Sequence, residues 1–169
     1  MTIEVLCNDV NVRSSHGYYI AESLAMCGRC SAATRVFAVA LPHEHETIAL
    51  DPDADCDESA QDTWETVGFS AFLFYLERIS EAVRQRLTQL APGLRFSFSA
   101  QLQGAYWANH CECCDSLLED HELFCEPEGA FLPVHRTDEM RFLRIDAPFE
   151  AFAAGYVCAP PSLAVWPRS

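Results

Sequence analysis

The sequence contains no lysine, so each of its 11 strong cations is an arginine. It has 25 aspartate and glutamate residues, and its formal net charge is −14. Binding to a phosphate backbone or to an anionic membrane depends on clustered cations, and an acidic field opposes the approach. The composition therefore argues against nucleic acid and membranes as partners. Because arginine-only, alanine-rich usage is typical of GC-rich genomes, we also expect a bacterial source.

Long hydrophobic runs are missing as well. No apolar stretch reaches the roughly 18 residues of a membrane-spanning helix, and residues 1–9 lack the basic and apolar regions of a signal peptide. We therefore expect a cytoplasmic protein in which cysteines stay reduced and paired cysteines act as metal ligands or redox groups. The odd number of cysteines, 9, argues against a fully disulfide-bonded framework. A length of 169 residues fits a single domain, residues 1–169.

Two short cysteine pairs are the most informative feature of the chain. Cys27 and Cys30 form one Cys-x-x-Cys segment, and Cys111 and Cys114 form another, with 80 residues between the two. Zinc prefers four thiolates in a tetrahedron, and a Cys-x-x-Cys turn presents two of them at little cost in chain entropy. The spacing predicts one Zn²⁺ ion held by all four cysteines. Cys113 lies inside the second segment and could replace one of its two ligands.

The two segments resemble the knuckles of zinc ribbons, in which each of two β-hairpins supplies a Cys-x-x-Cys turn. Zinc-ribbon knuckles usually carry glycine after the second cysteine, where the chain takes a left-handed turn. Here those positions are Ser31 and Asp115, and serine is the clearer departure. The long separation implies that residues 51–93, an acidic loop followed by a helix, are inserted between the two zinc-ribbon halves.

The fold predicted from the patterns is α+β: an antiparallel sheet carries two zinc-knuckle hairpins, and one long amphipathic helix packs on it. Apolar residues spaced by threes and fours predict the helix at Gly68–Leu90, after a capping box formed by Asp62 and Glu65. Its predicted buried stripe is Phe69, Phe72, Leu73, Leu76, Ile79, Val83, Leu87 and Leu90.

β-Branched, aromatic and alternating segments predict the strands. They are residues 17–26, 34–41, 45–50, 94–103, 105–110, 121–125 and 140–145. In residues 94–103, the face formed by Leu94, Phe96, Phe98, Ala100 and Leu102 is predicted to be buried. Residues 148–155 begin with proline and end with glycine, which predicts two helical turns.

A closed four-cysteine site is a structural device, so the preferred function is a zinc-binding, protein-interaction module rather than an enzyme. The acidic segment 51–65 would suit a basic partner, although a solvated loop that aids solubility explains it more simply. Mimicry of nucleic acid by the acidic surface stays open as a third possibility. The remaining cysteines, Cys7, Cys56, Cys125 and Cys158, are predicted to be buried and unligated.

The alternatives from another class are a zinc-dependent hydrolase and a thiol redox enzyme that use the same cysteines. A catalytic zinc site would recruit histidine and a carboxylate. The candidates are His43, Glu44, His45, Glu46, His110, Glu112, His121 and Glu122. A redox pair needs a depressed thiol pKa, to which Arg29 could contribute, but neither knuckle precedes a strong helix pattern.

Overall fold

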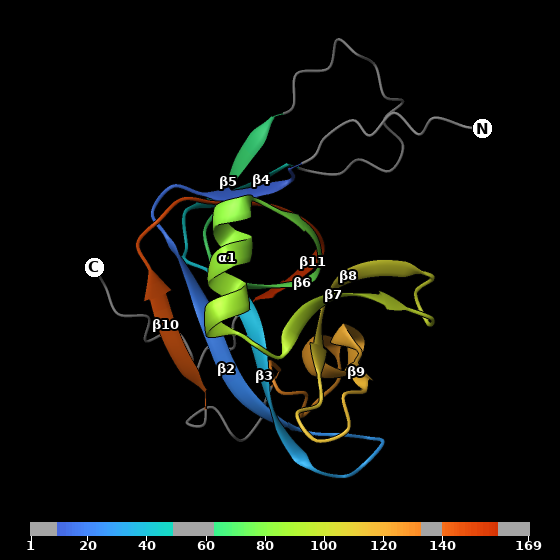
Figure 1. Ribbon diagram of the computed structural model, residues 1–169. Helices are drawn as coiled ribbons and strands as arrows, with labels where there is room; N and C mark the ends of the chain where they lie inside the picture. The colour runs from blue at the N-terminus through green and yellow to red at the C-terminus, as the bar shows by residue number, and fades with distance from the viewer. Residues whose placement is uncertain (1–9, 49–62, 133–139, 159–169) are drawn as a thin grey trace, which may run out of the picture.

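The computed structural model describes residues 10–48, 63–132 and 140–158. Within these ranges the chain forms a large antiparallel sheet, a small antiparallel sheet, one α-helix and one π-helical turn. In Figure 1 the large sheet and the helix α1 make up the body, and a hairpin of the small sheet, β7–β8, projects from its side. The fold is therefore dominated by β-structure.

The large sheet has the strand order β10-β2-β3-β6-β11-β1-β4-β5. In chain order its strands are β1 (Val12–Ser14), β2 (Tyr18–Met26), β3 (Ala33–Leu41), β4 (His45–Ile48), β5 (Trp64–Val67), β6 (Ala71–Ile79), β10 (Arg141–Ile145) and β11 (Phe149–Cys158). The small sheet, in the order β7-β8-β9, consists of β7 (Leu94–Ser99), β8 (Gly104–His110) and β9 (Leu117–Leu118). The helix α1 spans Glu81–Leu90, and the π-helical turn η1 spans His121–Cys125.

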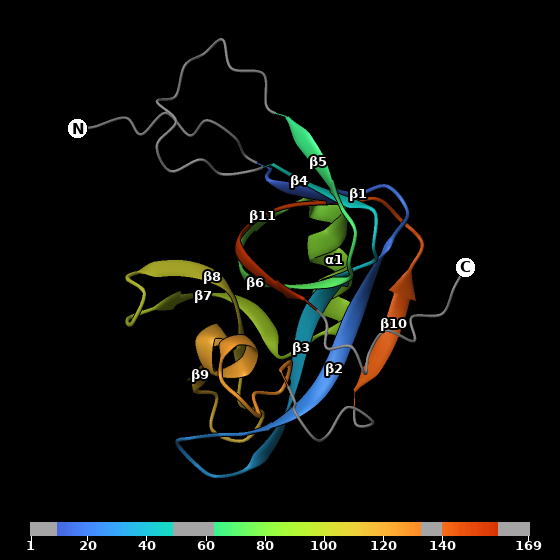
Figure 2. The same ribbon diagram turned by 180° about the vertical axis from the view of Figure 1, so that it is seen from behind.

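The large sheet curls into a half-barrel around α1 (Figure 2). The helix contributes Val83 and Leu87 to an apolar core on the concave face, where they meet residues of six of the sheet's strands. A second core lies on the opposite face of β2, β3 and β6, where Phe72 packs against Phe124 of η1 and against Phe131. The central strands are therefore buried on both sides.

The predicted α+β fold with a long helix at Gly68–Leu90 is wrong. Only Glu81–Leu90 is helical, capped by the hydroxyl of Ser80, which accepts a hydrogen bond from the backbone N–H of Val83 at 3.3 Å. The preceding Ala71–Ile79 is strand β6. Because β6 is covered on both faces, its apolar residues do not alternate, and such a run fits a helical period as well as a strand. The predicted capping box fails too: Glu65 lies in β5, and Asp62 is outside the described residues.

Two further elements differ from prediction. Residues 148–155 belong mostly to β11, not to a helix, because pairing with β1 and β6 overrides the local helix preference of its alanines. Residues 121–125 form η1, not a strand. The predicted strands at 17–26, 34–41, 105–110 and 140–145 are confirmed within one residue at each end, and those at 45–50 and 94–103 are confirmed in their first four and six residues.

Among the described residues, no helix is long and apolar enough to span a bilayer.

Candidate metal centre

The two knuckles lie at matching ends of two β-hairpins. Cys27 directly follows β2, and Cys111 directly follows β8. Each knuckle is closed by the same two backbone hydrogen bonds, made in the first by Cys27 with Ala32 and Ser31, and in the second by Cys111 with Ser116 and Asp115. The donor–acceptor distances are 2.8 to 2.9 Å in both. The two turns are therefore structural equivalents.

Both turns use a left-handed residue after the second cysteine. The backbone φ is 60° at Ser31 and 61° at Asp115, the region in which zinc-ribbon knuckles usually place glycine. A non-glycine residue there costs about 1–2 kcal/mol, and aspartate tolerates the conformation better than serine. The structure thus keeps the knuckle geometry at both positions, including Ser31, where the sequence departs from the zinc-ribbon pattern.

The four predicted cysteines lie together although 81 positions separate Cys30 from Cys111. Their four Sγ atoms lie within 4.8 Å of one another. The Sγ atoms of Cys27 and Cys114 are 3.7 Å apart, and so are those of Cys30 and Cys111. A tetrahedron with zinc–sulfur bonds of about 2.3 Å has sulfur–sulfur edges of about 3.8 Å. The cluster can therefore hold one metal ion, and these two distances are close to the edges of such a tetrahedron.

Ser116 adds a hydroxyl to the cluster. Its Oγ lies 3.3 Å from Sγ of Cys27 and 3.1 Å from Sγ of Cys114. This hydrogen bond, followed by those from the backbone of Cys30 and Arg29, lowers the pKa of Cys27 to about 6. The Ser116 hydroxyl and then its backbone also lower the pKa of Cys114. Both sulfurs therefore favour the thiolate, which is the form that binds metals.

The pKa of Cys30 is shifted in the opposite direction. A backbone hydrogen bond from Ala32 lowers its pKa, but desolvation and the neighbouring sulfurs of Cys114, Cys111 and Cys27 outweigh it and raise the pKa to about 12. Negative charge on adjacent sulfurs disfavours a further thiolate. A bound cation would remove that repulsion and allow all four sulfurs to ionise.

Asn109 joins the small sheet to the large one just before the second knuckle. Its side-chain oxygen accepts from the backbone N–H of Phe37 at 2.7 Å, and its side-chain nitrogen donates to the carbonyl of Phe37 at 2.9 Å. The fully buried amide thus pairs with β3 as a peptide group would. Because β3 leaves the first knuckle and β8 enters the second, this contact sets how the two knuckles face each other.

A second link lies on the surface of the site. Glu112, inside the second knuckle, accepts hydrogen bonds from the guanidinium of Arg35 at 2.7 and 2.9 Å and from its backbone N–H at 3.2 Å. The backbone N–H of Glu112 donates to the hydroxyl of Thr34 at 2.9 Å. The guanidinium of Arg35 lowers the pKa of the Glu112 carboxyl. Both partners are partly exposed, so the ion pair contributes at most about 1 kcal/mol, but it orients the knuckle.

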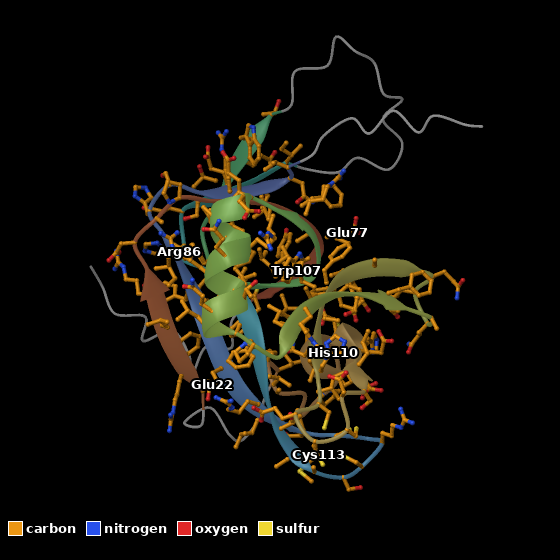
Figure 3. The ribbon with its side chains drawn as sticks, viewed as in Figure 1. Glu22, Glu77, Arg86, Trp107, His110 and Cys113 are labelled. Carbon is orange, nitrogen blue, oxygen red and sulfur yellow. The ribbon has the colours of Figure 1, made fainter. Side chains whose placement is uncertain are left out.

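The other cysteines take different roles. Cys113 is exposed at the knuckle end of the molecule (Figure 3), and it lies outside the four-sulfur cluster. Its backbone N–H points at Sγ of Cys111, 3.4 Å away. Cys125 is partly buried against the second core, but Cys158 is exposed at the end of β11, so its predicted burial is wrong. Cys7 and Cys56 lie outside the described residues.

The histidines proposed for a catalytic zinc do not join the cluster of the described residues. Nε2 of His110 lies 3.1 Å from the hydroxyl of Ser97, and Nδ1 lies 3.0 Å from the carbonyl of Ala108. Desolvation, followed by the charge of Arg95, lowers the pKa of His110. His45 is buried in the large sheet with Nδ1 2.7 Å from a backbone carbonyl. The hydrolase interpretation therefore finds no histidine ligand here.

Sequence reasoning missed the roles of Asn109 and Ser116, which are polar residues that support the cluster. Asparagine before a cysteine pair carries no signal of its own, because its role depends on β3, which is remote in sequence. Ser116 occupies the position equivalent to Ala32, so the comparison of the two knuckles could have drawn attention to its extra hydroxyl.

No known protein family, curated protein or solved structure matches this chain. The resemblance to zinc ribbons therefore rests on the two knuckles alone. The geometry provides four converging sulfurs from two hairpins, with their supporting hydrogen bonds, and can hold a metal ion.

Proposed function

We propose that this chain is a zinc-binding protein whose four-cysteine site fastens the β8–β9 unit to the β2–β3 hairpin. The observation that carries the proposal is the sulfur geometry: 3.7 Å between Cys27 and Cys114 and between Cys30 and Cys111, against about 3.8 Å for tetrahedral zinc. Four thiolates leave no position for water or substrate, which favours a structural role over catalysis.

The metal would cross-link two turns that lie 81 positions apart in the sequence and that otherwise meet through the contact of Asn109 with Phe37 and the packing of the two sheets. Zinc binding to thiolates in small zinc domains supplies about 10–16 kcal/mol. Zinc would therefore make a large contribution to the stability of the arrangement of the two sheets. A cytoplasmic location is part of the proposal, since it would keep the thiols reduced.

The biological role that fits a structural zinc is that of a protein-interaction module. The net charge of −14 opposes nucleic acid and anionic membranes, which leaves protein as the preferred partner. The acidic segment 51–65 lies mostly outside the described residues, and its proposed basic partner therefore rests on the sequence. The narrower zinc proposal does not depend on that partner.

Serine substitution of each cysteine, with metal content measured on the purified protein, tests the zinc proposal. We expect one zinc per chain in the wild type and its loss in Cys27→Ser, Cys30→Ser, Cys111→Ser and Cys114→Ser. Cys113→Ser is the matched control, because this thiol lies in the same knuckle but outside the cluster. Retention of a full zinc ion by each of the four variants would contradict the proposal, as would loss of zinc in the control.

A further inference from the structure

Strand β7 exposes the apolar face that the sequence predicts to be buried. Leu94 at its start lies in the core, but Phe96 and Phe98, further along the same face, are 56% and 62% exposed. Leu102, in the turn that follows, is 43% exposed. Trp107 of β8 lies opposite Phe96, with the ring centres 6.1 Å apart, where the hairpin leaves the body (Figure 3). The aromatic row thus runs out of the core onto the surface.

β7 is also an open sheet edge. It pairs with β8 from Leu94 to Ser99 without a bulge, and within the described ranges no strand pairs with its other side. Natural edge strands are usually protected by lysine, proline, a bulge or an inward charge. The only charged residue of β7 is Arg95, which is ion-paired with Asp115. An unprotected edge flanked by exposed phenylalanines is suited to accept another strand.

The charge distribution favours the same face. Residues 82–111, which include most of α1, β7 and β8, contain no aspartate or glutamate, although the chain has 25 of them. The arginines here are partly neutralised, since Arg84 pairs with Glu81 and Arg95 with Asp115. The carboxylates beside β7, Asp115 and Glu119, are bonded to its own Arg95 and Ser99, so a second copy of this acidic chain meets no carboxylate on β7 itself.

We propose that β7 pairs antiparallel with β7 of a second copy of the chain, which joins the two small sheets into one continuous sheet across a twofold axis. The sequence Phe96-Ser97-Phe98 is symmetric about Ser97. A twofold axis there sets Phe96 opposite Phe98 of the second copy, on one face, and sets Arg95 opposite Ser99. No like charges face each other in this register.

The pairing is weak because the interface is small. A fully buried aromatic side chain removes about 150–250 Å² from water, so two half-exposed phenylalanines per copy supply about 400 Å² of aromatic surface over the dimer. With strand pairing added, the interface stays below the ~1,200 Å² of stable complexes. The dimer is therefore expected to form and dissociate with protein concentration. This proposal rests on the proposed role as a protein-interaction module and names a second copy of the chain as the partner. It does not depend on the identity of the metal.

Sedimentation velocity of the full-length, metal-loaded protein tests the pairing, in a phosphine reductant that prevents disulfide exchange. From low to several hundred micromolar, we expect the wild type to pass from the mass of one chain to that of two. Phe98→Glu should raise the dissociation constant at least ~30-fold, because each dimer would gain two carboxylates in apolar surroundings. The matched control is Leu143→Glu, which places the same charge at a 47% exposed leucine on the edge strand β10 and should leave dimerisation unchanged.

Hydrogen exchange provides a readout that does not depend on a variant. Amides of residues 94–99 should gain protection with rising wild-type concentration, whereas amides of β10 should not. A wild type that stays monomeric at every concentration would overturn the proposal and leave the edge to a different protein. Dimerisation weakened equally by Leu143→Glu would also overturn it. Zinc content, measured on the same samples, reports separately on the metal site.

Discussion

Replacing Asn109 by alanine removes the amide that joins β8 to β3. The change leaves the N–H and the carbonyl of Phe37, paired at 2.7 and 2.9 Å in the wild type, without their partner in a buried setting. An unsatisfied buried donor or acceptor costs about 1–3 kcal/mol. We expect a loss of about 2–4 kcal/mol in the free energy of unfolding, since water entering the vacated space would restore part of the bonding.

Asn11 provides a matched control, because its side-chain amide also pairs with the N–H and the carbonyl of a single backbone residue, in another part of the large sheet. Its side-chain nitrogen donates to the carbonyl of Ala153 at 2.7 Å, and its side-chain oxygen accepts from the N–H of Ala153 at 2.9 Å. Asn11→Ala should therefore cost a similar 2–4 kcal/mol. Urea unfolding of the two variants, each loaded with metal, measures this directly.

The two variants should differ in metal affinity. Asn109 is two residues from Cys111 and sets how the knuckles face each other, whereas Asn11 precedes β1 and pairs with β11, and neither strand carries a cysteine of the cluster. Loss of residues that orient metal ligands typically weakens metal binding 10–100-fold. We expect that loss for Asn109→Ala in competition with a chromophoric chelator, and a change of less than about threefold for Asn11→Ala. An equal loss in both variants would refute the reasoning that Asn109 acts through the geometry of the site.

Two further predictions concern the body of the fold. Burial raises the pKa of the Asp120 carboxyl to about 7, despite a hydrogen bond from the N–H of Tyr75 at 2.7 Å. Because the folded state then holds this proton more tightly than the unfolded state, with its pKa of about 3.9, the free energy of unfolding should fall as pH rises from about 4 to 7, by up to ~4 kcal/mol. Asp120→Asn should remove this component, and an unchanged pH profile of urea unfolding would contradict the assignment. Gly17 has φ of 101°, and an added Cβ would lie 2.6 Å from the carbonyl oxygen of Ile145, so Gly17→Ala should cost at least ~2 kcal/mol. Gly28→Ala, with no atom within 4 Å of the added Cβ, should be nearly neutral in thermal unfolding, and equal losses would show that strain at Gly17 is not the cause.

The cysteine cluster could be predicted from the sequence because each knuckle is a local structure. Two cysteines three positions apart chelate in a turn, whatever fold surrounds them. The pairing of the two knuckles followed from zinc's preference for four ligands, and the structure brings together the four cysteines expected. The supporting residues could not be predicted in this way, since Asn109 contacts Phe37, 72 positions away.

The prediction of a helix across Ala71–Ile79 failed for a physical reason that periodicity does not reveal. Phe72 faces the second core, whereas Leu73 and Leu76 face the first, so β6 has no polar side to mark it as a strand. Its aromatic content, Phe72, Phe74 and Tyr75, is the better indicator, together with Ser80 as the helix cap. The alternation of β7 was interpreted correctly as a strand, but its exposure depends on where the core ends, and a sequence pattern does not carry that information.

X-ray absorption at the zinc edge tests the central claim most directly. On the purified, untagged protein, we predict one zinc per chain with four sulfur neighbours at about 2.3 Å and no nitrogen or oxygen in the first shell. The spectrum of Cys113→Ser should match that of the wild type. A first shell of mixed sulfur and nitrogen or oxygen, or a protein that binds no zinc when supplied with it, would contradict the structural four-cysteine site.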